Sequence, residues 1–137
     1  MDCIFCRIAR GEIPSHKVYE DEATLAFLDI NPATRGHTLV IPKQHAPDIF
    51  SLPDDALAAA ARTMQTVARI LQQGLQPDGI NVLQNNGPAA GQVVFHYHMH
   101  MIPRWEGDYA LRMWKPGTTD HAAFAALATQ LRNAGGV

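Results

Sequence analysis

The longest periodic run of apolar residues lies in the middle of the chain and predicts an amphipathic helix. It starts near Pro53, where Asp54 and Asp55 place negative charge in the first turn. Gly74 and Pro77 stop it. The apolar positions recur at alternating steps of four and three, which puts them in one stripe that we expect to pack on a sheet. They are Leu57, Ala61, Met64, Ala68, Leu71 and Leu75.

Shorter segments with strand character lie on both sides of this helix. They cover residues 16–20, 24–30, 37–41 and 79–84, together with an alternating run that begins at Phe95. An Ala-rich segment, 122–132, predicts a second helix at the C-terminus. Strands that follow one another, with one long inserted helix and one C-terminal helix, favour an α+β domain over βαβ units. We expect its sheet to be mainly antiparallel and five-stranded.

Composition fits one compact domain over residues 1–137. The chain is 47% hydrophobic and 18% charged, and it has no internal repeat or linker. Its 11 basic and 13 acidic side chains give a net charge of −2 without a Lys/Arg cluster, which argues against binding to polymeric nucleic acid. No targeting segment or membrane-spanning run is visible. We therefore expect a cytosolic (cytoplasmic) protein that does not bind a membrane.

The two cysteines, Cys3 and Cys6, form a C-x-x-C pair near the N-terminus. In a cytosolic chain without a thioredoxin-like context, such a pair binds a metal more often than it forms a structural disulfide. The simpler alternative is two reduced cysteines that flank an apolar turn.

The run FHYHMHMIPR is the stretch that indicates chemistry, because its histidines recur at every second position. At strand period, His96, His98 and His100 would line one face about 7 Å apart. The residues of the opposite face would be Phe95, Tyr97, Met99 and Met101. One histidine in a strand is usually a core or edge residue, but three on one face indicate a functional site. An H-x-H pair can also ligate zinc or iron with a third ligand elsewhere.

The triad, with the apolar residues around it, resembles the signature of the histidine triad (HIT) family, His-φ-His-φ-His-φ-φ with φ apolar. Tyr97 is the least apolar φ. Further matches in the family's order extend the resemblance over nearly the whole chain, at residues 3–8, 12–14, 26–30, 36–43 and 91–92. The chain is most similar to the small Hint-like branch. That resemblance implies the HIT-like fold, a homodimer with one larger continuous sheet, and hydrolysis or transfer of nucleoside monophosphates.

The resemblance also implies roles for the histidines. His98 would attack the α-phosphorus of a nucleoside monophosphate derivative and form a covalent nucleotidyl-histidine, which water then resolves. The backbone carbonyl of His96 would orient the His98 ring. His100 and His37 would donate hydrogen bonds to the phosphoryl oxygens and the leaving group.

Substrate binding is implied for a further group of residues. Asn85 and Gln92 would position phosphate oxygens, and Asp29 would accept hydrogen bonds from both ribose hydroxyls. The purine would be enclosed by Ile4, Phe5, Ile8, Phe27 and Ile30. Without the resemblance, such Ile and Phe residues in a small domain indicate core rather than a base-binding site.

The cysteine pair leads to a second hypothesis, a structural metal site. Cys3, Cys6, His45 and His96 would form a closed Cys₂His₂ site for Zn²⁺, as in similar microbial members of the family. The cysteine pair has no other evident use in the chain. The phosphoryl chemistry does not require this ion.

Two departures from the family pattern leave the leaving group open. Val93 stands where some relatives carry Ser or Thr, and the segment after Arg104 is long and helical rather than a short tryptophan-containing tail. Three functions remain. The first is a hydrolase or transferase of purine nucleoside phosphoramidates and adenylylated small molecules. The second is a dinucleoside polyphosphate hydrolase, and the third is a zinc-containing nucleotide-binding protein with little turnover.

Overall fold

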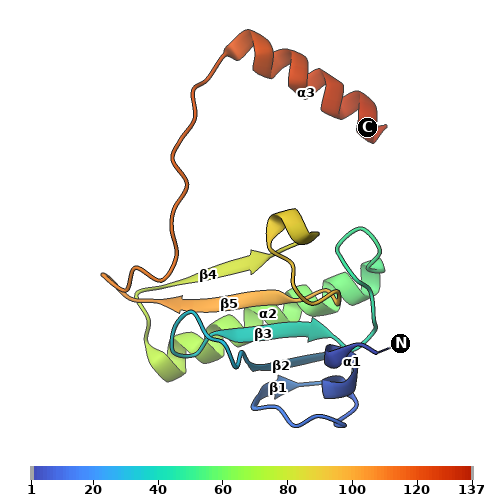
Figure 1. Cartoon of the computed structure of the whole chain (residues 1–137), viewed down its shortest axis with the longest axis vertical. Coiled ribbons are helices and arrows are strands. Elements are labelled where there is room, and N and C mark those ends of the chain that lie inside the picture. The colour runs from blue at the N-terminus through green and yellow to red at the C-terminus, as the bar shows by residue number, and fades with distance from the viewer. Residues whose placement is uncertain (1, 137) are drawn as a thin grey trace.

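The computed structural model describes residues 2–136, and its strands form one antiparallel sheet in the order β1-β2-β3-β5-β4 (Figure 1). The strands are β1 Lys17–Glu20, β2 Thr24–Leu28, β3 Thr38–Pro42, β4 Gly79–Gln84 and β5 Met99–Arg104. The helices are α1 Ile4–Ala9, α2 Asp54–Leu75 and α3 His121–Gly135, with a 3₁₀ turn η1 at Pro88–Ala90. The predicted α+β class and five-stranded antiparallel sheet are confirmed.

The strand that carries the triad is shorter than its alternating pattern predicted. β5 begins at Met99, and residues 95–98 lie outside the strand in a bend and an extended link. β5 itself is central, since Met101 pairs with Thr38 of β3 on one side and with Val82 of β4 on the other. The histidines therefore lie where the chain enters the middle of the sheet.

The sheet separates two apolar clusters. Val40, Met99 and Met101 pack on the face covered by α2. Leu39 and Ile41, the neighbours of Val40 in β3, belong to the cluster beneath α1. Successive side chains of a strand point to opposite faces. This alternation explains why β2 and β3 are continuous apolar runs, as strands with both faces buried are.

Helix α2 packs with a face slightly rotated from the predicted stripe. Its buried residues are Ala56, Ala60, Thr63, Val67 and Leu71. Leu71 was predicted correctly, but Ala61 is exposed, and the remaining stripe residues pack at the margin of the cluster. Apolar periodicity missed Thr63, whose hydroxyl lies 2.6 Å from Thr24 Oγ1 and is therefore satisfied inside the core.

The predicted C-terminal helix is present as α3, and it stands away from the sheet (Figure 1). Asp120 caps it by accepting a hydrogen bond from the backbone N–H of Ala123. None of its described residues is buried, and Phe124, Leu127 and Leu131 form an exposed apolar face. Within residues 2–136, no helix combines the length and apolar character needed to cross a bilayer.

Gly36 has a φ of +88°, and a Cβ placed there would lie 2.4 Å from Leu75 Cδ1 and 3.3 Å from Pro103 Cγ. We expect Gly36→Ala to lower the free energy of unfolding by about 2–4 kcal/mol, because it adds backbone strain to overpacking. Gly74→Ala is the matched control. It has open space around its Cβ position, so it should be neutral or stabilise α2 by up to about 1 kcal/mol. Chemical denaturation compares the two, and equal stabilities would contradict the close packing at Gly36.

Candidate active site

His98 lines a cavity on the α1 face of the sheet. Its Nδ1 lies 2.7 Å from the backbone carbonyl oxygen of His96. Because a carbonyl oxygen only accepts, Nδ1 carries the proton and Nε2 keeps its lone pair. Burial lowers the pKa of His98 below its ordinary value, so the ring is neutral at pH 7. His98 thus has the free imidazole nitrogen that a nucleophile needs.

His100 lies beside His98, with ring centroids 5.0 Å apart, and it is held from behind by His37. The Ala33 N–H donates to His37 Nδ1 at 2.9 Å, so the neutral His37 ring carries its proton on Nε2. That Nε2 lies 2.9 Å from His100 Nδ1. Burial lowers the pKa of both rings, that of His100 to about 4. His100 therefore accepts at Nδ1 and carries its one proton on Nε2.

The expectation that three imidazoles share one face is wrong for His96. Residues 95–98 do not have strand geometry, so the two-residue period does not extend back from His98. The His96 side chain is completely buried and points instead to the cysteines of α1. Its carbonyl, however, contacts the His98 ring as predicted.

The cavity beside His98 has a volume of about 450 Å³ and walls that are mainly apolar. It is lined by all members of the predicted purine-binding set, Ile4, Phe5, Ile8, Phe27 and Ile30. Ile30 is 83% exposed and lies at the rim. Asp29 also lines the cavity, and its Oδ1 accepts a hydrogen bond from the Asn31 N–H at 2.8 Å. The residues brought together match the size and chemistry of a small-ligand site.

Three predicted site residues lie outside this lining. Gln92 is buried, and its side chain bonds the Gly87 N–H and the carbonyl of Pro47, so it holds the loop together and does not face the cavity. Asn85 lies behind Gly91, a residue that does line the cavity. His37 is only 6% exposed and is also absent from the lining. The contact of these three residues with a phosphate stays a prediction.

Sequence reasoning missed two polar residues of the cavity wall, Ser15 and His16. They follow the matched segment at 12–14 directly, but neither belongs to a recognisable motif. Among residues 2–136, Ser15 Oγ is the buried side-chain polar atom without a hydrogen-bond partner. No spacing signal in the sequence could have placed it in the same cavity as His98, because only the chain path from α1 to β1 does so.

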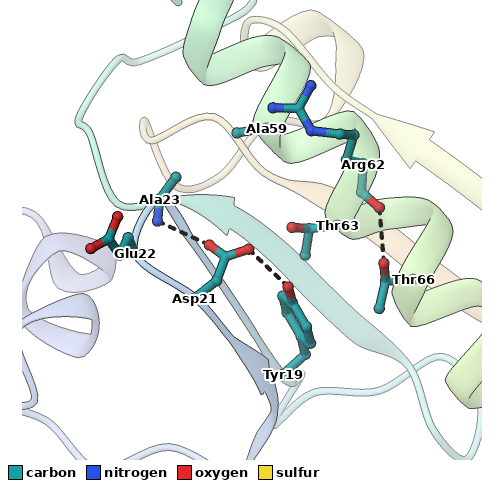
Figure 2. Close-up of a pocket in the computed structure, with 8 residues that line it drawn as sticks. All are labelled: Tyr19, Asp21, Glu22, Ala23, Ala59, Arg62, Thr63 and Thr66. Atoms are coloured by element: carbon teal, nitrogen blue, oxygen red, sulfur yellow. Dashed lines mark hydrogen bonds between the residues drawn. The ribbon is translucent and has the colours of Figure 1, made fainter.

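A second cavity, of about 470 Å³, lies between the β1–β2 turn and α2 (Figure 2). Its carboxylate Asp21 accepts hydrogen bonds from Tyr19 Oη and from the backbone N–H groups of Ala23 and Thr24. The Asp21 carboxylate is therefore engaged in stabilising the β1–β2 turn. The cavity contains no histidine or cysteine, so we assign the candidate chemistry to the cavity beside His98.

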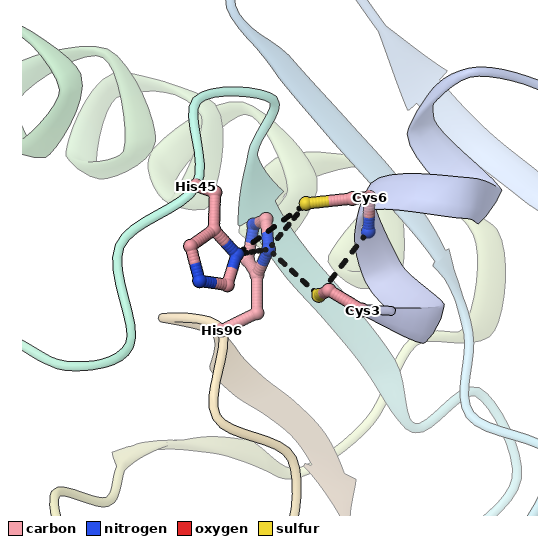
Figure 3. Close-up of side chains that lie close together, drawn as sticks. All are labelled: Cys3, Cys6, His45 and His96. Carbon is pink, nitrogen blue, oxygen red and sulfur yellow. Dashed lines mark hydrogen bonds between the residues drawn. The ribbon is translucent and has the colours of Figure 1, made fainter. Parts of the chain in front are cut away.

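Cys3, Cys6, His45 and His96 form a compact cluster at the start of α1 (Figure 3). Sulfur-to-nitrogen distances are 3.4 Å for Cys3–His96 and for Cys6–His45, and the two Nδ1 atoms are 3.2 Å apart. Bonds of about 2.3 Å to sulfur and 2.0 Å to nitrogen at tetrahedral angles give edges of about 3.5 Å and 3.3 Å. The four side chains therefore fit a Zn²⁺ ion.

The proton position on His96 also suits a metal. Its Nε2 lies 2.7 Å from the Pro42 carbonyl oxygen and must donate to it, which leaves the Nδ1 lone pair facing the cysteines. Metal-bound histidines commonly donate their second ring N–H to such an acceptor. The tautomer of His96 is thus the one that metal ligation through Nδ1 requires.

Together, the sheet and the paired imidazoles define a domain in which a buried histidine, His98, lines a cavity of small-molecule size. The HIT domain model matches residues 10–107. Protein hit of Bacillus subtilis is 49% identical over 121 residues, covering 88% of this chain and 83% of its own. Adenylylsulfatase HINT3 of Arabidopsis thaliana is 46% identical over 107 residues, covering 78% and 54%. The chain belongs to the HIT family of nucleotide-binding proteins and hydrolases.

Solved structures agree with this membership. A HIT family protein from Bacillus subtilis superposes with a TM-score of 0.92 at 41% identity, covering 97% of this chain and 96% of its own. A zinc-bound histidine triad family protein from Mycobacterium smegmatis has a TM-score of 0.77 at 43% identity, covering 95% and 98%. The first superposition includes nearly the whole chain.

We expect protein purified without chelator to contain about one zinc per chain, because four ligand atoms already lie at tetrahedral spacing. Cys3→Ser with Cys6→Ser should remove the metal and lower the melting temperature. His121→Ala, which removes an exposed histidine on α3, is the control and should keep both. Elemental analysis with thermal melts measures the effect. A content well below one zinc per chain in the unmodified protein would reject the site.

Proposed function

We propose that this protein is a nucleotide hydrolase or transferase that cleaves derivatives of purine nucleoside monophosphates through a nucleotidyl-histidine. The observation that carries the proposal is the His98 ring, whose Nδ1–H is bound by the His96 carbonyl while Nε2 stays unprotonated beside the cavity. A neutral imidazole whose free nitrogen borders a cavity is able to act as an attacking group.

In the first step, the lone pair of His98 Nε2 attacks the α-phosphorus and a phosphorus–nitrogen bond forms. The bond from phosphorus to the leaving group breaks, and its electron pair departs with that group. In the second step, water attacks the same phosphorus, the electron pair of the phosphorus–nitrogen bond returns to Nε2, and a proton is released to solvent. The products are the nucleoside monophosphate and the unmodified His98 ring, so two easier displacements replace one difficult one.

His100 supports both steps from the adjacent position. Its Nε2–H is a fixed donor, because His37 occupies Nδ1 from behind. A donor that already points to the place where negative charge develops stabilises the transition state without reorganising. His37 acts on the substrate only through His100, since it does not line the cavity.

Substrate recognition divides the cavity between base and ribose. Apolar residues of α1 and β2, such as Phe5 and Phe27, enclose the purine, and the carboxylate of Asp29 accepts the ribose hydroxyls. The Phe5 ring is held in place before a base binds, because it contacts both Phe27 and His98 edge to face.

Leaving groups of several kinds are compatible with the exposed side of this site. Val93 is 84% exposed at the cavity and has no hydrogen-bond donor for the leaving group. A relative carries the name adenylylsulfatase, and sulfate leaves as a stable anion without needing a proton. On the family resemblance, adenylylated small molecules and phosphoramidates stay first and dinucleoside polyphosphates second; an amine, unlike sulfate or a nucleotide, must take up a proton from solvent as it leaves. Turnover rates on an adenosine phosphoramidate and a diadenosine polyphosphate separate the two.

The metal belongs to the structural part of the proposal. A closed Cys₂His₂ site supplies folding stability rather than chemistry, because it leaves no open coordination position. Cys3 and Cys6 at the start of α1, His45 after β3 and His96 before β5 would hold the ion, and they tie the helix that lines the cavity to the segment before β5 that carries His98.

We expect His98→Ala to abolish turnover while AMP still binds, because the nucleophile is lost and the cavity walls remain. Mass spectrometry of the unmodified protein trapped with substrate should show one nucleotidyl group on His98. His121→Ala, which removes an exposed histidine on α3 outside the cavity lining, is the control and should still form the adduct. Free imidazole should partly restore turnover in His98→Gly. Tight AMP binding without any adduct would instead support the binding protein with little turnover.

We also propose a homodimer. β4 is an edge strand with the exposed residues Val82 and Leu83, and α3 carries an apolar face that this chain does not cover. A second copy would bury both, and an isolated helix as short as α3 is marginal in water. Light scattering after gel filtration should give twice the mass of 15.0 kDa. A monomer at micromolar concentration would contradict the proposal.

A further inference from the structure

Asp29, His37 and His100 bring one carboxylate and two imidazoles together at the wall of the cavity. Their ligand atoms lie within 4.8 Å of one another. Such a group is able to hold a metal ion with two nitrogens and one oxygen, or it is a chain of hydrogen bonds. The location of one proton distinguishes these two arrangements.

That proton lies on His37 Nε2. The Ala33 N–H donates to His37 Nδ1 at 2.9 Å, so Nδ1 is the acceptor and a neutral ring has its proton on the other nitrogen. A metal bound at Nε2 would force the proton onto Nδ1, where it would face the Ala33 N–H. The backbone thus opposes metal binding and favours the hydrogen-bonded arrangement.

The His37 proton has two acceptors within reach. His37 Nε2 is 2.9 Å from His100 Nδ1 and 3.5 Å from Asp29 Oδ2. The geometry is held by the backbone, because the Asp29 N–H donates to the His37 carbonyl at 2.9 Å. Asp29 Oδ1 is already used by the Asn31 N–H, so Oδ2 is the oxygen that attracts the proton. His37 is almost completely buried, and solvent therefore screens this attraction little.

We propose that ribose binding at Asp29 is transmitted through His37 to His100, so that the ribose hydroxyls strengthen the donor that faces the reacting phosphate. This inference rests on the proposed function. Hydroxyls that donate to the carboxylate neutralise part of its charge, and the His37 Nε2–H then donates more fully to His100 Nδ1. A stronger bond at Nδ1 polarises the His100 Nε2–H, because hydrogen bonds in a chain reinforce one another. His37 is a positioning residue in this scheme.

The kinetic test compares an adenosine phosphoramidate with its 2′-deoxy analogue in single-turnover formation of the nucleotidyl-histidine. In the unmodified protein the deoxy substrate should bind more weakly and also react about tenfold more slowly, as the loss of about one hydrogen bond predicts. In His37→Ala the rate difference should disappear, while the difference in binding stays. The same rate ratio in both proteins would overturn the inference.

Asp29→Asn adds a second, isosteric variant. Its amide N–H in place of Oδ2 would face the His37 proton, so it should slow the chemical step for the ribose substrate as well as weaken binding. An effect of Asp29→Asn on binding alone would show that the carboxylate does not act through His37, and would also overturn the inference.

A spectroscopic test needs no variant. In protein with ¹⁵N-labelled histidine, AMP should shift the His100 Nδ1 resonance and the His37 Nε2 proton more than 2′-deoxy-AMP does, because only AMP supplies both hydroxyls. Equal shifts with a normal His98 adduct would overturn this inference and leave the proposed function intact. Failure of AMP to bind would overturn both this inference and the proposed function.

A metal titration tests the alternative arrangement. Zinc that binds Cys3→Ser/Cys6→Ser protein and shifts the His37 and His100 resonances would make Asp29, His37 and His100 a metal site instead.

Discussion

The site depends on backbone groups that decide which nitrogen of each imidazole holds the proton. The Pro42 carbonyl takes the Nε2–H of His96, the His96 carbonyl takes the Nδ1–H of His98, and the Ala33 N–H occupies Nδ1 of His37. A neutral ring has one proton for two nitrogens, so each contact also decides the state of the opposite nitrogen. One residue type thereby supplies a candidate metal ligand, a candidate nucleophile and a candidate donor. Burial lowers the pKa of all three rings and keeps them neutral.

His96 connects the Cys/His cluster with His98, because its side chain and its backbone carbonyl contact different parts of the structure. Its side chain reaches Cys3 and Cys6 on the α1 side, and its carbonyl orients the His98 ring. Helix α1 in turn contributes Phe5, whose ring contacts both His96 and His98 edge to face. Since α1 has only six residues, its position depends on these contacts rather than on its own helical stability. The N-terminal helix, the Cys/His cluster and His98 therefore form one structural unit.

Sequence patterns predicted most of the elements, and their failures share a cause. The strands, α2 and α3 lie close to their expected places because apolar periodicity reports local geometry. The burial of Thr63 was missed because its hydroxyl is bonded to that of Thr24 inside the core, and apolar periodicity cannot indicate a buried polar pair. Gln92 fits the family pattern for a phosphate contact, which stays a prediction, but no pattern indicated that its side chain would bond the backbone of Gly87 and Pro47. The expected position of His96 assumed a strand where the chain bends.

The sequence by itself determined which chemical groups are present and roughly where each strand and helix lies, since residue type and spacing along the chain act locally. It also carried the motif that marks the family. Only the tertiary structure decided which way the His96 and His100 rings face, because their hydrogen-bond partners lie far apart in the sequence. Pro42 lies 54 residues from His96, and His37 lies 63 residues from His100. Such partners meet only when the sheet has formed, and with them the proton positions on which the chemistry rests are set.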